Sequence, residues 1–379
     1  MLAQENQYKR EVCGRSTRSL SKTVILLTLI GLPFVIPLPT LYYFLCYAWN
    51  RLPEPAVLQA SEAAPFHRPL GLLAQVLLHG TRRLLRNGLP RTFQAQEAEL
   101  ASLRGRIELA PSLGRGLLER GRAICTFDEL SPDSPLHRLL AQTLGTLTSA
   151  ADLPLVLRRE VSQVRQRFPA SLSAAPAMPP TASTFRELRR QRLDSQAAFL
   201  LHVCELVWQT ALPEPTARGR NRFTDFRRDE ALMARLFEQF TRNFFRREQR
   251  RYRVYAETIA WQAEGQTDDL ALLPTMLTDT TLEAPDHKII LDTKYYAAAL
   301  RPRYDRQRLI APHLYQLYAY LQNQRPAPNQ TLEGILLYPA ATHAVDLRYT
   351  LGGHPVRVVT LNLHQPWEGI ATDLLGLIA

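Results

Sequence analysis

The spacing of hydrophobic residues predicts a first half that is rich in helices. Over 67–88, leucines recur three and four positions apart and arginines gather on the opposite face, as in an amphipathic helix packed on a core. Residues 93–110 alternate between apolar and polar positions, which favours strands. The helices predicted in this part of the chain are 41–49, 67–88, 134–148, 155–167, 185–212 as one long helix, and 230–249.

From residue 252 onward, the pattern changes to short strands around one helix. The helix is predicted over 311–323 and contains Tyr315, Tyr318 and Tyr320, which we expect to pack in a core. The predicted strands are 252–260, 272–278, 288–292 and 334–338, with a turn at 284–286 between the second and the third. This order of elements predicts an α/β (α+β) domain with one mixed central sheet.

The clearest break in composition is a stretch of proline and small residues at 169–184. Proline with alanine and serine does not build a packed element, so we predict an interdomain linker there. The expected organisation is an N-terminal extension over 1–36, a first α+β domain over 37–168, the linker 169–184, and a second domain over 185–379 with a helical lead-in.

An apolar run near the N-terminus leaves two interpretations open. No charged residue occurs from Thr23 to Asn50, a run of 28 residues that is long enough to cross a membrane. Gly31 and the prolines at 33, 37 and 39 interrupt the run, and no small-x-small cleavage site follows convincingly. We favour a buried segment or an extension from an upstream start codon over 1–36. A membrane anchor over 24–49 is the alternative.

The chain is basic, with 46 lysines and arginines against 35 acids and a net charge of +11. Only four of the basic residues are lysines, and the other 42 are arginines, which bind phosphate in a bidentate manner. Between Arg218 and Arg253, twelve arginines accompany five acids. This surplus can attract double-stranded DNA without reading its sequence. A solvated, arginine-rich helix face is the alternative interpretation.

Several common sites are absent from the sequence. The four cysteines lie far apart without a CxxC pair, which argues against a disulfide framework or a zinc ribbon and favours a reducing, cytoplasmic location. No Gly-Lys dipeptide occurs, so the sequence contains no phosphate-binding P-loop. The nine histidines are scattered and form no HExxH motif.

A strand end in the second half has residues suited to phosphodiester hydrolysis. The predicted strand 288–292 is apolar and leads into Asp292-Thr293-Lys294. Because side chains alternate along a strand, Asp292 and Lys294 lie on the same face. Lysine is scarce in this chain, which makes a lysine at this position informative.

Two further carboxylates are expected near this pair. The preceding predicted strand ends at Asp279, 13 residues before Asp292, and a short turn between antiparallel strands would bring the two acids together. Glu238 is a lone carboxylate in an apolar helix segment. A pairing of Glu238 with Arg235 or Arg242 explains this residue equally well.

These residue types suit a site for Mg²⁺, a hard cation that prefers carboxylate oxygens, keeps several waters and also binds phosphate. Such a cation acidifies a bound water and offsets the negative charge that builds up on phosphorus. Lys294 would orient or deprotonate that water and stabilise the transition state. The sequence therefore predicts a metal-dependent phosphodiesterase site.

Six segments in a fixed order make the chain similar to a known family. They are Ile36–Trp49, Arg104–Ile107, Cys125–Leu130, Leu236–Phe240, Asp292–Tyr296 and Leu314–Tyr320. With these segments the sequence resembles the PD-(D/E)xK nucleases and, more narrowly, the McrC family, the nuclease subunit of 5-methylcytosine (McrBC-type) restriction systems. The resemblance covers most of the chain from Ile36 onward, and the set of segments is specific where any single one is not.

The resemblance implies roles for the candidate residues and a restriction-endonuclease-like fold for 185–379. The implied catalytic and accessory positions are Asp279, Asp292, Lys294, Glu238 and Gln316. Mg²⁺ would be held by Asp279, Asp292 and the backbone carbonyl of Thr293.

One departure from the family pattern affects this assignment. The usual Pro-Asp pair reads Pro274-Thr275 here, so we assign the acid to Asp279, whose spacing to Asp292 fits the family better. If Thr275 were the equivalent position, the metal site would be damaged.

The resemblance also implies partners. McrC proteins act with McrB, a GTP-hydrolysing AAA+ hexamer that binds methylated DNA, and their N-terminal half inserts into that ring and stimulates GTP hydrolysis. The region 37–168 would then be the partner-binding domain, and GTP would bind the partner. We expect a Mg²⁺-dependent DNA endonuclease subunit. The alternative is a catalytically inactive adaptor that only stimulates the AAA+ GTPase.

Overall fold

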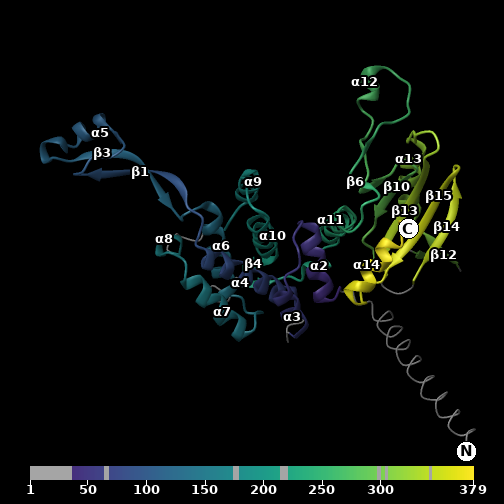
Figure 1. Cartoon of the computed structure of the whole chain (residues 1–379), viewed down its shortest axis with the longest axis horizontal. Coiled ribbons are helices and arrows are strands. Elements are labelled where there is room, and N and C mark those ends of the chain that lie inside the picture. The colour runs from purple at the N-terminus through teal and green to yellow at the C-terminus, as the bar shows by residue number, and fades with distance from the viewer. Residues whose placement is uncertain are drawn as a thin grey trace, which may run out of the picture. The chain divides into compact units, whose positions relative to one another are not determined.

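A computed structural model describes residues 36–63, 68–173, 179–213, 221–296, 300–303, 306–340 and 344–379, and it divides into two compact units (Figure 1). Unit 1 joins the residues up to Pro53 to Phe226–Ala379, and unit 2 is Glu54–Asp225. The stretch expected as a linker, 169–184, therefore lies within unit 2, with 174–178 outside the described residues. The first described helix belongs with the C-terminal half of the chain rather than with 54–168.

Unit 1 is built on a six-stranded mixed sheet, which confirms the predicted α/β fold with one central sheet (Figure 1). In their order across the sheet, the strands are β14 (Asp346–Leu351), β15 (His354–Leu361), β13 (Thr331–Pro339), β10 (His287–Thr293), β9 (Thr280–Glu283) and β6 (Arg253–Tyr255). The strands β10, β13 and β15 are parallel, whereas β14, β9 and β6 pair antiparallel with their neighbours. Because parallel neighbours need a crossover, the chain forms a helix between β10 and β13.

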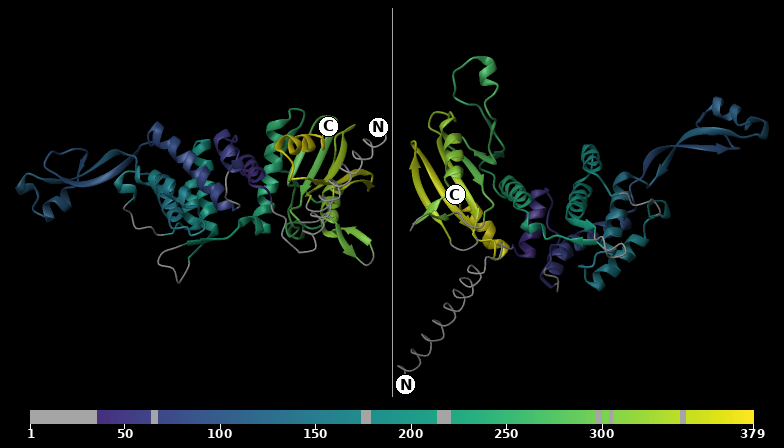
Figure 2. Two further views of the ribbon diagram at one scale, coloured as in Figure 1. Left: turned by 90° about the horizontal axis from the view of Figure 1, so that it is seen from below. Right: turned by 180° about the vertical axis from the view of Figure 1, so that it is seen from behind.

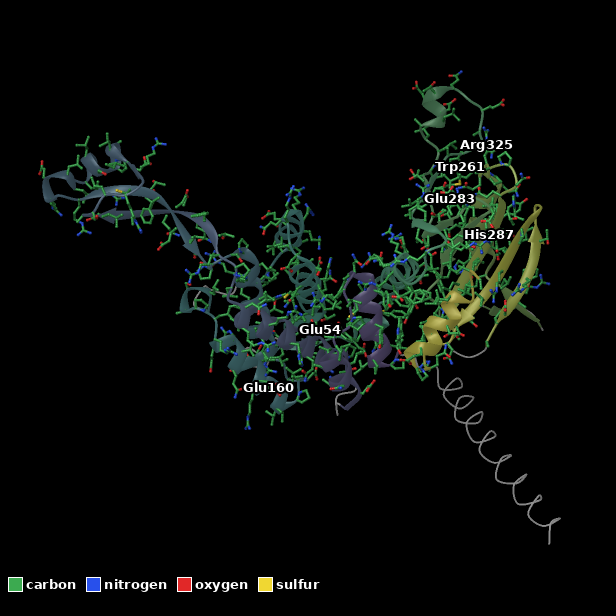
Figure 3. The ribbon with its side chains drawn as sticks, viewed as in Figure 1. Glu54, Glu160, Trp261, Glu283, His287 and Arg325 are labelled. Carbon is green, nitrogen blue, oxygen red and sulfur yellow. The ribbon has the colours of Figure 1, made fainter. Side chains whose placement is uncertain are left out.

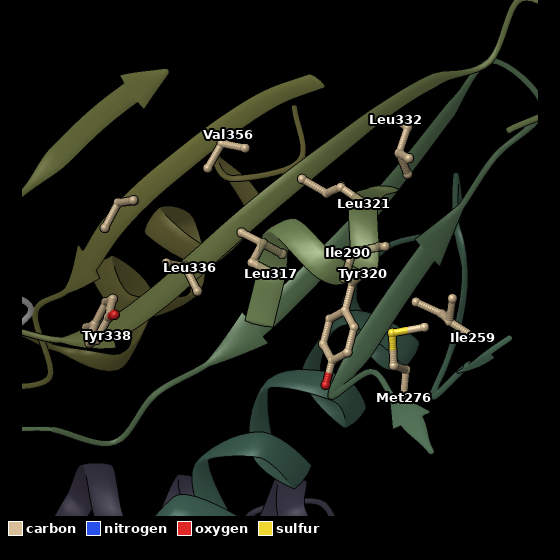
Figure 4. Packing of buried hydrophobic residues seen from close by; sticks show 11 residues of the cluster. Ile259, Met276, Ile290, Leu317, Tyr320, Leu321, Leu332, Leu336, Tyr338 and Val356 are labelled. Atoms are coloured by element: carbon tan, nitrogen blue, oxygen red, sulfur yellow. The ribbon is translucent and has the colours of Figure 1, made fainter. Parts of the chain in front are cut away.

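This crossover helix, α13 (Ala311–Gln322), covers one face of the sheet. Leu317, Tyr320 and Leu321 on its inner face pack in one cluster with Ile290 of β10 and Leu336 of β13 (Figure 4). Burying each such side chain stabilises the fold by about 1.5–3 kcal/mol. The packing holds α13 over the strand that leads into the candidate site.

The expectation that three tyrosines of α13 pack in the core is wrong for two of them. Tyr320 is 5% exposed, but Tyr315 and Tyr318 are 69% and 42% exposed. The buried positions of the helix are 313, 317, 320 and 321. Positions 315 and 318 fall outside that stripe of a 3.6-residue period and face outward.

A second, aromatic core joins α2 (Leu38–Ala48) to α11 (Glu230–Glu248) within unit 1. The rings of Phe44 and Phe240 stack with centroids 4.0 Å apart. The Tyr47 hydroxyl donates a hydrogen bond to Glu248 Oε1 at 2.7 Å. This core therefore packs α2 against α11, the helix that carries the candidate residue Glu238.

The remaining elements of unit 1 are η2 (Phe226–Arg228), β7 (Thr258–Ile259), α12 (Thr267–Leu270), β8 (Met276–Leu277), β11 (Leu300–Arg303), β12 (Arg306–Leu309) and α14 (Trp367–Leu375).

The strands before β10 differ from the prediction. The expected strand 252–260 is divided into β6 and β7, and the expected strand 272–278 contains only the two-residue β8 at its end. The leucines that suggested a strand follow α12 in a loop, where Leu272 is 83% exposed. The antiparallel partner of β10 is β9, with Thr280 opposite Leu291. Asp279 therefore precedes a strand instead of ending one.

Unit 2 combines packed helices with a β ribbon that extends away from them (Figures 1 and 2). Its helices are α3 (Pro55–Ala63), α4 (Pro69–Asn87), α6 (Pro135–Thr148), α7 (Leu155–Gln166), α8 (Ala170–Ser173), α9 (Ala182–Arg190) and α10 (Ser195–Thr210), with a short pair of strands, β4 (Ala211–Pro213) and β5 (Asn221–Phe223). We call residues 92–131 the arm. The arm comprises β1 (Thr92–Leu100), β2 (Arg106–Ile107), α5 (Leu109–Gly114), η1 (Leu118–Arg120) and β3 (Ala123–Ser131).

The helix predicted over 185–212 is in fact two helices. The break falls between α9 and α10, at residues 191–194. Asp194 caps the second helix, because its Oδ1 accepts a hydrogen bond from the Ala197 amide at 2.7 Å. In the sequence, the signal for this break is Asp194, a residue type that favours helix N-termini, within the apolar pattern of 185–212.

The apolar run of 23–50 lies only partly within the described residues, and 23–35 fall outside them. Its described end forms α2, which has 11 residues. Across the portion of the chain that the structure describes, no helix has both the length and the apolar character needed to cross a membrane.

Candidate active site

The end of β10 brings Asp292 and Lys294 together. Asp292 is fully buried, at 0% exposure, and pairs with Leu336 of the parallel strand β13. The ladder continues one residue further, where the Lys294 amide donates to the Leu337 carbonyl at 2.9 Å. The Lys294 ammonium then lies 2.7 Å from Asp292 Oδ2. The predicted Asp-x-Lys pair thus shares one face of the strand end.

Asp279 contacts the same strand end from the turn before β9. Its Oδ2 accepts two hydrogen bonds from Thr293, one from the backbone amide at 2.8 Å and one from Oγ1 at 2.7 Å. The two acids are therefore neighbours, although the hairpin that joins them is formed by β9 and not by the strand expected at 272–278. Thr293, the last residue of β10, lies between Asp292 and Lys294 in the chain and fixes the carboxylate of Asp279.

A chain of hydrogen bonds connects Lys294 to α13. Lys294 donates to Gln316 Oε1 at 2.7 Å, and Gln316 Nε2 donates to the Tyr320 hydroxyl at 2.7 Å. The Tyr320 hydroxyl in turn donates to the Leu277 carbonyl at 2.9 Å. Since Lys294 has partners on both β10 and α13, its long side chain is held in one direction.

Glu238 lies on α11, and its partner is Arg242, one turn further along the helix. Arg242 Nη1 donates to Glu238 Oε1 at 3.0 Å and to the backbone carbonyl of Asp279 at 2.7 Å. The structure therefore places Glu238 beside Asp279, and the helical pairing considered as an alternative also exists.

Burial gives Asp292 an unusual proton affinity. Loss of solvation, and next the negative charge of Asp279, raise the pKa of Asp292 to about 7, although Lys294 acts in the opposite direction. Both carboxylate oxygens of Asp292 are buried, and neither accepts a well-aligned hydrogen bond despite the close Lys294 ammonium. Burial, followed by Asp279, also raises the pKa of Glu238. The site concentrates negative charge that its own cations offset only in part.

We expect the metal-free Asp292→Asn variant to be more stable than the wild type at pH 8. Its free energy of unfolding should be higher by on the order of 2 kcal/mol. The folded pKa of Asp292 lies above its unfolded value of about 3.9, so the folded chain holds the extra proton between these values. The contribution of the Asp292 carboxyl group to the free energy of unfolding is fully present below about pH 4 and is lost as the pH rises to about 7. Urea unfolding in EDTA between pH 4 and 8 measures the difference, and equal pH slopes for variant and wild type would contradict it.

The donor set fits a hard divalent cation. Asp279 and Asp292 supply carboxylate oxygens, and the oxygens of Asp292 are buried without a well-aligned hydrogen bond, so a cation would satisfy them. Among the described residues, no three His, Cys, Asp or Glu side chains come together as a metal site. An ion at this position would be held by the two aspartates, with backbone carbonyl and water oxygens completing its shell.

Comparisons with known proteins identify the family of the chain. Residues 40–339 match the family model for "McrBC 5-methylcytosine restriction system component". The chain belongs to this McrBC family. It is 31% identical over 345 residues to the Escherichia coli (strain K12) protein "Type IV methyl-directed restriction enzyme EcoKMcrBC", covering 90% of this chain and 97% of that protein.

A solved structure has a similar fold. It is a chain of the "Refined half-complex from tetradecameric assembly of Thermococcus gammatolerans McrB AAA+ hexamers with bound McrC", matched with a TM-score of 0.55 and 12% identity. The match covers 90% of this chain and 76% of the other. At this identity the likeness concerns the fold, which the two chains share.

The departure of this McrBC-family chain at Pro274-Thr275 lies in the segment between α12 and β8. Thr275 is exposed and precedes β8. The Pro274 carbonyl accepts a hydrogen bond from Trp261 Nε1 at 2.6 Å, at the foot of the loop that carries α12 (Figure 3). Asp279, in contrast, is bound to Thr293. The geometry therefore favours Asp279 as the acidic position.

Sequence reasoning missed two residues of this McrBC-family site. Arg242 was considered only as a helical partner of Glu238, and its contact with the Asp279 carbonyl joins residues 37 positions apart. Tyr320 was expected in the core, but its hydroxyl also connects Gln316 to the Leu277 carbonyl. No local pattern in the sequence predicts either contact, because both depend on how α11 and α13 pack around the β8–β9 turn.

Proposed function

We propose that this chain is the Mg²⁺-dependent DNA endonuclease subunit of a McrBC-type, modification-dependent restriction system, with a nuclease unit of the PD-(D/E)xK kind. The observation that carries the proposal is the convergence of Asp279, Asp292 and Lys294 at one strand end. The family relation supports a restriction function, and the donor set supports a divalent cation. In this proposal the chain acts in the cytoplasm on double-stranded, methylated DNA.

In the proposed reaction, Asp279 and Asp292 would hold the cation, and the carbonyl of Thr293 would be a further ligand. When bound, Mg²⁺ supplies positive charge against the negative charge that develops on the scissile phosphate, and it acidifies water. Lys294 positions the attacking water and stabilises developing negative charge, because Asp292 and Gln316 hold its ammonium in place. Thr293 keeps Asp279 aligned through its amide and hydroxyl.

Glu238 and Gln316 act as accessory residues on the two helices beside the strand end. Gln316 orients Lys294 from α13. Glu238 lies on α11 next to Asp279, where burial and then the charge of Asp279 raise the pKa of Glu238. These roles are indirect, so we expect their loss to reduce cleavage less than the loss of Asp292 or Lys294.

Arginines on and beside α11 would bind the DNA backbone. Arg228, Arg235 and Arg250 are exposed in unit 1. Arg251 and Arg253 instead pair with Asp286 and Glu283, so they contribute less free charge. Contacts of this kind bind phosphate without reading base sequence, which leaves recognition of the methylated base to another component.

We propose that the arm of unit 2 binds a McrB-like AAA+ GTPase hexamer, since the Thermococcus gammatolerans assembly consists of McrB AAA+ hexamers with bound McrC. The arm exposes large apolar side chains that a ribbon alone has no means to bury. Those that are more than half exposed are Phe93, Leu103, Leu109 and Leu113. No residue of β1 is buried. Exposed apolar surface of this extent is typical of a protein interface.

The test of this function is the cleavage of supercoiled plasmid by the purified chain with Mg²⁺, its AAA+ partner and GTP. Methylated and unmethylated plasmids are compared, and the partner and GTP are each omitted in turn. We expect linear product only from methylated plasmid in the complete mixture. An unchanged plasmid in every mixture, with GTP hydrolysis by the partner still stimulated by this chain, would identify an inactive adaptor instead.

A further inference from the structure

Arg242 joins two parts of the candidate site through a single nitrogen. Its Nη1 donates to Glu238 Oε1 at 3.0 Å and to the Asp279 carbonyl at 2.7 Å. A terminal guanidinium nitrogen carries two hydrogens, so both bonds are possible at once. The side chain is 17% exposed, and its partners come from α11 and from the turn before β9.

This arrangement differs from an ordinary helical ion pair. Pairs at positions i and i+4 on a helix surface are solvated, and their geometry changes freely. Arg242 instead reaches a backbone carbonyl of another element, at the residue that carries a candidate metal ligand. The Nη1 nitrogen of the guanidinium is therefore held between α11 and the turn before β9, and with it the carboxylate of Glu238.

The three carboxylates of the site have different partners. Asp292 faces the Lys294 ammonium and has two buried oxygens without a well-aligned hydrogen bond, and Asp279 accepts two hydrogen bonds from Thr293 at one oxygen. Glu238, the third carboxylate, faces the positive charge of Arg242. A second divalent cation beside Asp279 would need Glu238 as a ligand, at the position where the guanidinium already lies.

We infer that Arg242 is a positioning residue that holds Glu238 against the backbone of Asp279 and limits the site to one divalent cation. This inference rests on the proposed nuclease function, since it concerns the cation held by Asp279 and Asp292. In two-metal phosphodiesterases a second cation supplies positive charge, and here the guanidinium of Arg242 would supply positive charge beside Glu238 instead. A single cation and Lys294 then serve the reaction.

The inference is tested by counting Mn²⁺ ions bound to the full-length chain, from the electron paramagnetic resonance signal of free Mn²⁺. Ions at the site are those that the Asp292→Asn variant loses. We expect one such ion for the wild type and for Arg242→Lys, which keeps the positive charge. We expect two for Arg242→Met, because Glu238 is then free to bind. The double variant Arg242→Met/Glu238→Gln should return to one.

Arg246→Met is the matched control. Arg246 lies one turn along α11 and also donates to a backbone carbonyl, that of Val254 at 3.0 Å, so its loss should leave one ion at the site. Two ions in the wild type, or a single ion in Arg242→Met with an unchanged circular dichroism spectrum, would overturn the inference. A wild type that binds no more ions than Asp292→Asn would instead contradict the proposed metal-dependent function.

Discussion

Replacing Lys294 with alanine is expected to lower the rate of DNA cleavage about a thousandfold, with GTP hydrolysis by the partner still stimulated. The ammonium of Lys294 lies 2.7 Å from both Asp292 Oδ2 and Gln316 Oε1, and in the proposed reaction it positions the water and offsets charge on phosphorus. Arg242 does not replace it, because its guanidinium already binds Glu238 and the Asp279 carbonyl. Single-turnover cleavage of methylated plasmid measures the rate.

Gln316→Ala provides the graded comparison for this prediction. It removes one of the two supports of Lys294 and leaves the other, so we expect a loss of about tenfold. Stimulated GTP hydrolysis in both variants shows that the chain is folded and assembled. Cleavage by Lys294→Ala at the wild-type rate would show that this site does not perform the reaction.

Exchanging Leu113 and Leu118 of the arm for aspartate together is expected to weaken binding to the AAA+ partner about a hundredfold or more. The two leucines are 63% and 41% exposed, so a charge at either position costs little in the free chain. In a contact surface, each aspartate would be buried without a partner. Titration of the labelled chain with the partner, followed by fluorescence anisotropy, measures the dissociation constant.

Leu155→Asp is the matched control for the arm. Leu155 begins α7 in the same unit, outside the arm, and is 64% exposed. The change adds the same kind of charge on unit 2 and should leave partner binding within about twofold of the wild type. An equal loss of affinity for Leu155→Asp, or no loss of affinity for the arm variant, would contradict the proposal that the arm binds the partner.

The central pair of the site was predictable because its signal is local. Asp292 and Lys294 follow an apolar strand, and the two-residue period of a strand alone puts them on one face. The fold class followed in the same way from the order of strands and helices. The spacing between Asp279 and Asp292 also predicted that the two acids lie close together, but the sequence did not predict that Asp279 precedes a strand instead of ending one.

The parts that sequence reasoning missed depend on contacts between distant segments. The apolar residues before Asp279 suggested a strand, yet Leu272 is exposed in a loop and the true partner strand starts at Thr280. The position of α2 in unit 1 is set by rings such as Phe44 and Phe240, nearly 200 residues apart in the chain. Local hydrophobic patterns carry no information about such pairings, so the division into units at 53 and 225 did not follow from composition.

The most direct test of the proposed nuclease function compares wild type with Asp292→Ala in the cleavage of methylated plasmid, with Mg²⁺, the AAA+ partner and GTP present. We predict linear product from the wild type only, none from Asp292→Ala at equal assembly, and none from the wild type when EDTA replaces free Mg²⁺. Cleavage by Asp292→Ala at the wild-type rate would contradict the proposed function, because the buried carboxylate at the end of β10 would then have no part in the reaction.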